Sequence, residues 1–144
     1  RAGFITGPNH SGAKLHGFLS YLVKSSIKKK KYTLIGYKGK QVRDNIHSHD
    51  LVSCFWEFYK KPRNGEVYNI GGGRYSNCSI LEALNLVEKI SKIRIKKNYL
   101  KANRIGDHIW YISDLTKFKK HYPFWHQIYS KKKIINELIK KFKY

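Results

Sequence analysis

The chain has 144 residues, 41% of them hydrophobic, which is enough for one domain with a buried core. Its 30 lysines and arginines against 9 acidic residues give a formal net charge of +21, which favours an anionic partner. No stretch reaches the roughly 18 apolar residues of a membrane-spanning helix, and the first residues form no hydrophobic signal region. We expect a cytoplasmic protein. Because the chain has no methionine and opens inside an apolar segment, we also expect it to be part of a longer one.

The positive charge is concentrated in lysine runs, at residues 28–31, 96–97, 131–133 and 140–141. One interpretation is a basic module that binds nucleic acid, helped by aromatic side chains, which make up 15% of the chain. The other is that the lysines decorate solvated faces, since arginine, which binds phosphate in a bidentate manner, is scarce. We favour solvated faces, because most aromatic residues fall at positions expected to be buried.

The sequence offers little for metal or disulfide chemistry. Cys54 and Cys78 are its only cysteines, and we expect both to be buried free thiols. His47, His49, Asp50 and Cys54 could be written as a metal cluster, but Cys54 lies a turn into the next helix, away from the histidines. No second ligand pair has zinc spacing. We therefore predict no metal site, and local hydrogen bonds for His47 and Asp50.

The first half of the chain predicts strands and helices in alternation. Residues 3–6 form a short apolar strand. The following helix has apolar residues at helical spacing, namely Leu15, Phe18, Leu19, Leu22, Val23 and Ile27. Residues 33–35 and 42–47 are strands separated by a turn at Gly36 and Gly39. The next helix has Asp50 as its N-cap and is apolar on most sides, so we expect it to be deeply packed.

The second half begins with a predicted strand at residues 66–70 and a tight turn at residues 71–73. A phosphate-binding loop is the alternative for the turn, but the glycine spacing does not fit one. Ser79 and Glu82 form a capping box before a helix that runs to Ile90. Then follow a strand within residues 93–99, a loop and short strand at 104–113, a helix capped by Asp114, and an aromatic turn at 122–125. The last helix carries one apolar stripe, formed by Ile134, Ile135, Leu138, Ile139 and Phe142.

Six motifs in order resemble those of the extended short-chain dehydrogenases, and more narrowly the NAD-dependent nucleotide-sugar epimerases and dehydratases. The longest reads Gly36-x-x-Gly39-x-Gln41-x-Arg43-Asp44-x-Ile46-His47-x-x-Asp50-Leu51. The others are Arg1-Ala2-Gly3-Phe4-Ile5-Thr6-Gly7-Pro8, Leu15-His16-Gly17-Phe18-Leu19, Val67-Tyr68-Asn69-Ile70-Gly71-Gly72-Gly73, Asn77-Cys78-Ser79 and Arg104-Ile105-Gly106-Asp107-His108. The group that this chain resembles most is the CDP-paratose (CDP-tyvelose) 2-epimerases.

The resemblance covers essentially the whole chain and implies an α/β fold. The chain would be the C-terminal, substrate-binding portion of a Rossmann-type short-chain dehydrogenase, with the closing strands of the cofactor-binding sheet. Residues 1–8 and 66–92 would belong to the dinucleotide-binding sheet and its helix. Residues 9–65 and 93–144 would form the substrate-binding part.

The implied activity is NAD-dependent epimerisation of a nucleotide sugar, a CDP-sugar in the group named above, by transient oxidation and re-reduction in a homo-oligomeric enzyme. Such enzymes use a Gly-x-x-Gly-x-x-Gly turn to bind NAD and a Tyr-x-x-x-Lys pair to exchange a proton. We expect both to lie outside this chain; Tyr21 and Lys24, for example, are one residue too close. The chain alone would then be inactive, would hold no catalytic residue, and would leave NAD bound mainly elsewhere.

The same resemblance supplies the candidate site residues. Arg43 and Arg104 align with arginines that contact the pyrophosphate or its flanking ribose, and two converging arginines suit two phosphate charges. From its position alone, Arg43 could instead be a surface arginine paired with Asp44. Gln41, Tyr37 and Asp107 lie in the same motifs as the two arginines and are further substrate-binding candidates.

Two positions at the start of the chain complete the set. Phe4 stands where related hexose epimerases carry an asparagine that contacts the substrate, and this departure is expected in the CDP-sugar group. Gly3, beside it, is the cofactor-binding candidate.

Overall fold

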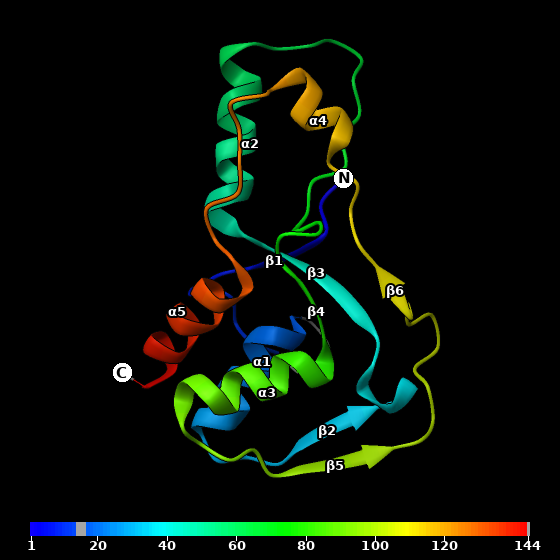
Figure 1. Ribbon diagram of the computed structural model, residues 1–144, viewed down its shortest axis with the longest axis vertical. Helices are drawn as coiled ribbons and strands as arrows, with labels where there is room; N and C mark the ends of the chain where they lie inside the picture. The colour runs from blue at the N-terminus through cyan, green and yellow to red at the C-terminus, as the bar shows by residue number, and fades with distance from the viewer. Residues whose placement is uncertain (14–16, 144) are drawn as a thin grey trace.

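The computed structural model describes residues 1–13 and 17–143 and shows an α/β chain drawn out along one axis (Figure 1). Its elements in chain order are β1 (Phe4–Thr6), α1 (Phe18–Ile27), β2 (Tyr32–Ile35), the 3-10 turn η1 (Tyr37–Gly39), β3 (Val42–His47), α2 (Ser48–Lys60), β4 (Asn77–Ser79), α3 (Ile80–Ser91), β5 (Lys97–Leu100), β6 (Trp110–Tyr111), α4 (Thr116–His121) and α5 (Lys131–Lys143).

β3 is the central strand, and all six of its residues are buried. Its first half pairs antiparallel with β4 and in parallel with β6, and its second half pairs in parallel with β1. β2 and β5 form a separate parallel pair. The predicted strands at residues 3–6, 33–35 and 42–47 are confirmed. Because this mixed sheet is mostly parallel, it needs cover on its faces, which the helices supply.

The larger core lies between α1, α3 and α5 in the lower part of Figure 1. The apolar stripe predicted for the last helix is confirmed, because Ile134, Ile135, Leu138 and Ile139 are buried there against α1 and α3. The lysines of α5 lie mostly on its outer face. The predicted contribution of Leu15 to the first helix, and the Leu15-His16 part of its motif, lie outside the described residues.

The smaller core lies in the upper part of Figure 1, between α2, α4 and the segment after α4. It contains Ile46, Leu51, Phe118 and Trp125. The helix predicted after Asp114 is present, but its N-cap is Leu115 and makes no side-chain cap. Asp114 lies one residue earlier, and its Oδ1 accepts hydrogen bonds from the Thr116 backbone and hydroxyl.

Three local predictions were wrong. Residues 66–70 form no strand; their one ladder contact is an isolated bridge between Ala2 and Ile70, because only the first residues of the chain lie beside them. The N-cap of α2 is His47, whose ring accepts from the His49 N–H, while Asp50 lies in the first turn and is buried. α2 is not deeply packed, since only Asp50, Leu51 and Cys54 of its residues are buried.

The expectation for the two cysteines is met. Cys54 and Cys78 are free and buried, and burial raises the pKa of each thiol to about 12. Among the described residues, no helix is both long and apolar enough to cross a bilayer.

Candidate functional site

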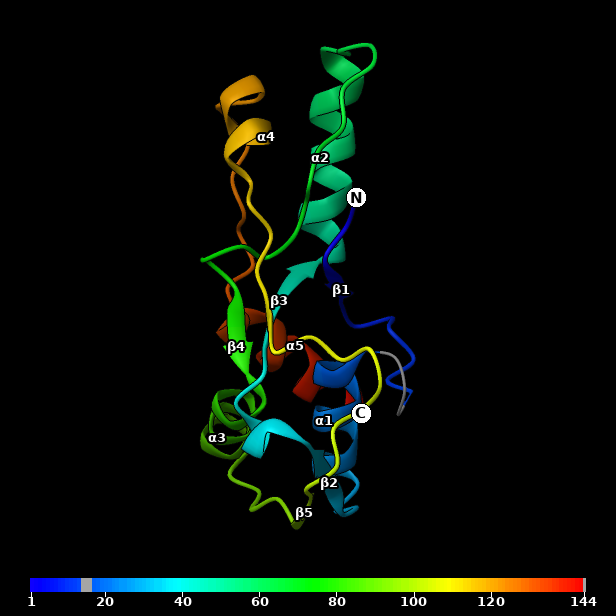
Figure 2. The same cartoon turned by 90° about the vertical axis from the view of Figure 1, so that its right-hand side faces the viewer.

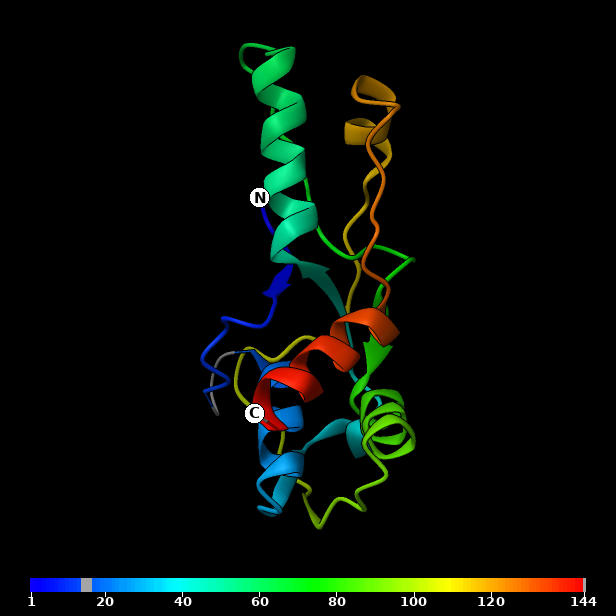
Figure 3. The same cartoon turned by 90° about the vertical axis from the view of Figure 1, so that its left-hand side faces the viewer.

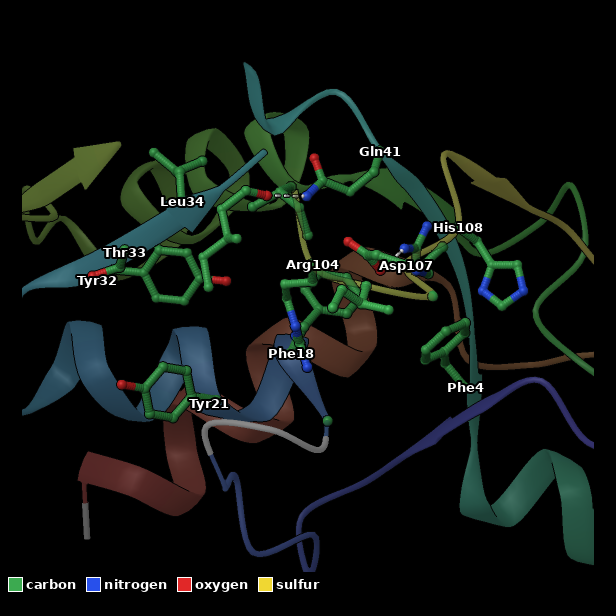
Figure 4. A pocket seen from close by; sticks show the side chains of 16 residues that line it. Phe4, Phe18, Tyr21, Tyr32, Thr33, Leu34, Gln41, Arg104, Asp107 and His108 are labelled. Carbon is green, nitrogen blue, oxygen red and sulfur yellow. Dashed lines mark hydrogen bonds and ion pairs between the residues drawn. The ribbon is translucent and has the colours of Figure 1, made fainter. Parts of the chain in front are cut away.

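A cavity of about 290 Å³ opens between the helix α1, the strand β2, the start of β3 and the loop that contains residues 104–108 (Figure 4). This volume is at the lower end of the range for ligand pockets, about 300–1,000 Å³, so the cavity can hold part of a nucleotide sugar. Its lining combines aromatic rings with polar groups. These residues include Phe4, Phe18, Tyr21, Tyr32, Gln41, Arg43, Arg104, Ile105, Asp107 and His108.

Arg43 is held in this cavity by strand β3 and by the loop. Its side chain is buried and forms an ion pair with Asp107. Nη1 donates to the Val42 carbonyl at 2.7 Å, and the guanidinium lies 5.6 Å from the centre of the Phe4 ring. The alternative of a surface arginine paired with Asp44 is therefore wrong.

Asp44 serves a different purpose in the sheet. It is fully buried, and its Oδ2 accepts from the backbone N–H groups of Gly73 and Ser113, at 3.1 and 2.9 Å. These bonds tie the chain after β6 and the glycine turn to β3. Its role is structural, because it holds these two segments against the central strand.

Arg104 reaches the same cavity from the loop before β6, and Figure 4 shows its side chain among those that line the cavity. The two arginines, about 60 residues apart in sequence, therefore line one pocket together with Gln41 and Asp107, as the resemblance requires. Arg104 is exposed, and it forms no ion pair within the described part of the chain. Its charge is available to a ligand.

Gln41 and Tyr37 occupy different positions relative to the cavity. Gln41 is buried and lines it, and its Nε2 donates to the Ile35 carbonyl at 2.9 Å. Its Oε1 is buried without a hydrogen-bond partner, which leaves an acceptor for a ligand donor. Tyr37 does not line the cavity; its hydroxyl lies 3.5 Å from the Asp107 carbonyl and supports the loop.

Phe4 lies at the cavity and Gly3 outside it. The Phe4 ring packs edge-on against Tyr111 at 5.5 Å and forms the floor below Arg43. Gly3 donates its N–H to the Ile70 carbonyl, and a Cβ there would lie 2.7 Å from Asp44 Oδ1. Close packing thus explains why this position is a glycine.

Motif reasoning missed several aromatic side chains of the cavity. Phe18 and Tyr21 come from α1 and Tyr32 from β2, and their rings could have been assigned to the core as readily as to a site. Burial raises the pKa of Tyr32 to about 12, with Tyr21 adding to the rise and Arg104 opposing it. No sequence signal separates these rings from ordinary core residues, because only the fold brings α1 and β2 to one cavity.

The expectation that the chain has no Tyr-x-x-x-Lys spacing was wrong, since Tyr129 and Lys133 have it. They lie at the start of α5, away from the cavity lining. The Tyr129 ring stacks on His47 at 3.8 Å, and Lys133 Nζ donates to the Ile128 carbonyl at 2.9 Å. Both side chains are thus engaged in contacts within the chain.

The residues considered for a metal site hold the fold together instead. His47 Nε2 lies 2.6 Å from Glu137 Oε2, and the Asp50 carboxylate accepts from the backbone of Ile128 and Tyr129. The bond from His49 to His47 is local as predicted, but the Asp50 contacts reach across the chain. In residues 1–13 and 17–143 no group of three or more potential ligands could hold a metal ion.

The glycine turn after residue 70 is a packing feature. A Cβ on Gly71 would lie 2.3 Å from Asp44 Oδ2, and one on Gly72 would lie 2.4 Å from the Asn45 carbonyl oxygen. Gly73 has φ +54°, which favours glycine. The predicted tight turn is confirmed, and none of the three glycines lines the cavity.

Comparison with known proteins agrees with this arrangement. Residues 1–71 match the NAD dependent epimerase/dehydratase family. CDP-paratose 2-epimerase of Salmonella typhi is 31% identical over 97 residues, which cover 66% of this chain and 28% of that protein. UDP-arabinose 4-epimerase 1 of Arabidopsis thaliana is 36% identical over 84 residues, which cover 57% of this chain and 19% of that protein.

Solved structures extend the similarity over almost the whole chain. UDP-glucuronic acid 4-epimerase of Bacillus cereus, in complex with UDP-glucuronic acid and NAD, has a TM-score of 0.80 and 25% identity over 99% of this chain and 44% of its own. UDP-glucose 4-epimerase of Thermotoga maritima, with UDP-glucose, has a TM-score of 0.84 and 22% identity, and so supports the fold alone. The chain spans less than half of each of these relatives.

The fold is thus the Rossmann-type α/β fold of the extended short-chain dehydrogenases. Within that class, residues 1–71 belong by sequence to the NAD-dependent epimerase/dehydratase family, and the similarity in fold extends over nearly the full length of the chain.

Proposed function

We propose that this chain forms the nucleotide-sugar-binding part of an NAD-dependent epimerase that acts on a CDP-sugar at its 2-position. The observation that carries the proposal is that Arg43 and Arg104 line one cavity with Gln41 and Asp107. The similarity to CDP-paratose 2-epimerase suggests the CDP-sugar, and the homo-oligomeric state expected of the whole enzyme is part of the same proposal.

The two arginines would act unequally on a diphosphate. Arg43 is already oriented by Asp107 and the Val42 carbonyl, so little side-chain freedom would be lost when it meets a phosphate oxygen. Arg104 is exposed and would lose more freedom on binding, but it has no ionic partner to give up among the described residues. A charge-assisted hydrogen bond to either contributes roughly 1.5–3 kcal/mol.

The remaining cavity groups suit the rest of the ligand. Gln41 Oε1 can accept from an N–H or O–H group, which both a base and a ribose offer. Tyr32, with a pKa of about 12, stays neutral, and its hydroxyl can donate a hydrogen bond to the ligand. The small volume leaves the sugar to extend beyond the part of the cavity that these residues line.

The dinucleotide fits this chain poorly. NAD, when bound, would take a hydride from the sugar carbon and return it to the opposite face. The glycines that could have cradled it, Gly3, Gly71 and Gly72, are packed against Asp44 or Asn45, so their backbones are not open to a pyrophosphate. The proposal therefore assigns nucleotide-sugar binding to this chain and no step of hydride transfer; Gly3 as a cofactor contact stays a prediction.

Titration calorimetry of the purified chain with CDP-glucose tests the proposal, with UDP-glucose and duplex DNA as competitors for selectivity. We expect Arg104→Ala to weaken binding of CDP-glucose about ten- to a hundredfold, since roughly 1.4 kcal/mol corresponds to a factor of ten. Lys140→Ala, on the exposed face of α5, is the matched control and should leave affinity unchanged. Circular dichroism checks that each variant is folded.

The net charge of +21 and the exposed lysines favour a second candidate, a basic nucleic-acid-binding module. The salt dependence separates the two. A pocket should bind CDP-glucose with a modest salt slope, whereas a lysine surface should bind DNA with a steep one. Equal losses from Arg104→Ala and Lys140→Ala, with DNA bound more tightly than CDP-glucose, would favour the module over the pocket.

A further inference from the structure

A groove beside β6 shares no lining residue with the cavity described above. Its volume of about 1,080 Å³ is just above the range of about 300–1,000 Å³ for ligand pockets, so it has room for a whole small ligand. The loop after the glycine turn and the segment from β6 to α4 form most of its lining, and both lie on the side of β3 away from α2 (Figures 2 and 3). We call it the rear groove; its lining includes Arg74, Tyr75, Trp110, Asp114, Lys119 and Gln127.

The two residues of β6 point to opposite faces, because side chains alternate along a strand. The Tyr111 ring packs edge-on against Phe4 at 5.5 Å, and Phe4 lines the cavity. Trp110 therefore turns to the other face and lines the rear groove, where it is 67% exposed. Tyr75, 48% exposed, lines the same groove from the loop after the glycine turn. Two accessible rings in one groove offer flat surfaces on which a base can stack.

Two cations of the rear groove are free to meet an anion. Arg74 comes from the loop after the glycine turn and Lys119 from α4, and both are exposed. Neither forms an ion pair with any residue that the structure describes. Among the described lining residues Asp114 is the one acid, and its Oδ1 already accepts from the Thr116 backbone and hydroxyl. Two cations against one acid leave the groove with a net positive charge, which favours an anionic ligand.

Gln127 adds a fixed hydrogen-bond acceptor. It is 8% exposed, and its Nε2 donates to the carbonyls of Gly71 and Gly72 at 2.9 and 2.8 Å. These two bonds fix the amide, and no described residue donates to its Oε1. A buried side chain with an unpartnered polar atom is uncommon in folded proteins. Since Gln127 lines the rear groove, its Oε1 is available to an N–H or O–H group of a ligand.

We infer that the rear groove is a second binding site, which takes a nucleoside monophosphate. The base stacks on Trp110 and Tyr75, and the phosphate meets Arg74 and Lys119. A phosphate monoester carries about −1.5 to −2 charges near pH 7, which two cations match. Gln127 Oε1 accepts from a ribose hydroxyl or an amino group of the base. Inorganic phosphate alone would leave both rings without a contact.

This inference does not depend on nucleotide-sugar binding in the cavity. The probe is AMP, titrated into the isotope-labelled full chain and followed by NMR. The three tryptophans give three indole N–H resonances, which Trp→Phe variants assign. We expect AMP to shift the Trp110 resonance. Trp56, which stacks on Tyr59, and Trp125, whose Nε1 donates to Ser53, lie outside the rear groove, so their resonances should not move.

Lys119→Ala removes one cation of the rear groove, and Lys120→Ala is its matched control. Lys120 is the next residue of α4, is also exposed and does not line the groove. Both variants lower the net charge by one, so only the position of the lost charge differs. We expect Lys119→Ala and Arg74→Ala each to weaken AMP binding about tenfold, as the loss of one charge-assisted hydrogen bond predicts, and Lys120→Ala to leave it unchanged. Because all three side chains are exposed, no variant should lower the melting temperature.

Four results would overturn the inference. AMP could leave the Trp110 resonance in place, or Lys119→Ala and Lys120→Ala could weaken binding equally, which would mean diffuse attraction. Inorganic phosphate that binds as tightly as AMP would deny the rings a role. Single-stranded DNA that displaces AMP with a steep salt dependence would make the groove part of a nucleic-acid surface instead. The proposed function fails separately, because Arg74→Ala should lose AMP and keep CDP-glucose, whereas Arg104→Ala should lose CDP-glucose and keep AMP.

Discussion

At the scale of single residues, Arg43 shows how the cavity reconciles a buried charge with a binding role. A buried guanidinium needs a partner, and Asp107 supplies it from a loop that also carries Arg104. The same loop therefore neutralises one arginine of the cavity and contributes a second. The pairing with Asp107 explains how the buried Arg43 is tolerated in the free protein, while Arg104 keeps its charge for an anionic ligand.

The two cysteines give a prediction at the same scale. Burial raises the pKa of both Cys54 and Cys78 to about 12, so the fraction of each thiol present as the reactive thiolate is negligible near neutral pH. We expect a disulfide reagent to label the native chain slowly, and to label two thiols rapidly after denaturation in guanidinium chloride. Rapid labelling of the native chain at neutral pH would show that these thiols are accessible and would contradict their place in the two cores.

At the scale of elements, sequence patterns predicted those features whose cause is local. The capping box of α3 is present as expected, with Glu82 N bonded to Ser79 Oγ and Ser79 N bonded to Glu82 Oε2. The apolar stripe of α5 was predicted correctly for a similar reason, because the spacing of apolar residues on one helix face is visible in the sequence. The strand predicted at residues 66–70 was wrong, because a strand needs a paired neighbour and a local sequence pattern does not show whether one is present.

The prediction that α2 is deeply packed was wrong for a related reason. An apolar face predicts that a helix packs against another element, but the sequence does not show whether that element belongs to the same chain. The cavity likewise depends on non-local placement: the convergence of Arg43 and Arg104 came from the resemblance, and spacing alone favoured a surface arginine. The aromatic wall from α1 and β2 could not be predicted, because its rings have the same pattern as core residues.

The capping box gives a prediction with a pH dependence. The bond from the Ser79 backbone is the main cause that lowers the pKa of Glu82. A carboxyl whose pKa is lower in the folded state stabilises the fold above its unfolded pKa and loses that contribution as pH falls through the folded pKa. Thermal unfolding across the acidic range should therefore show a smaller pH dependence for Glu82→Gln than for the wild type.

The same series separates the hydrogen bond from the charge. Glu82→Gln keeps an acceptor for Ser79, so at neutral pH it should cost less than Ser79→Ala, which removes the cap and should cost about 1 kcal/mol. If Glu82→Gln left the acidic part of the profile unchanged, Glu82 would not be the group that titrates there.

At the scale of the whole molecule, the chain is two cores joined by β3. The lower core is closed by α1, α3 and α5, while the upper one leaves an edge strand and an apolar helix side open. Exposed strand edges and apolar patches favour association. The cavity is lined mainly from α1, β2 and the loop of residues 104–108, and none of its lining residues comes from α2.

We predict that the chain by itself, with NAD added, will not interconvert CDP-paratose and CDP-tyvelose. Epimerisation requires a group that exchanges a proton with the sugar hydroxyl near neutral pH. Of the described residues at the cavity, Tyr32 has a pKa of about 12 and Asp107 is paired with Arg43. No lysine lines the described cavity, and the nearby charge of Arg104 lowers the pKa of Tyr32 by less than burial raises it.

The measurement is chromatographic separation of the two CDP-sugars after long incubation with a large amount of chain. The full Bacillus cereus epimerase acting on UDP-glucuronic acid shows that the assay conditions support turnover. Product from the wild-type chain that persists in Tyr32→Phe would mean that a group outside this argument, such as the exposed ring of His108, exchanges the proton. Product that disappears in Tyr32→Phe would mean that the environment of Tyr32 changes when the nucleotide sugar binds. Either result would place catalysis within this cavity and contradict the prediction that the chain alone is inactive.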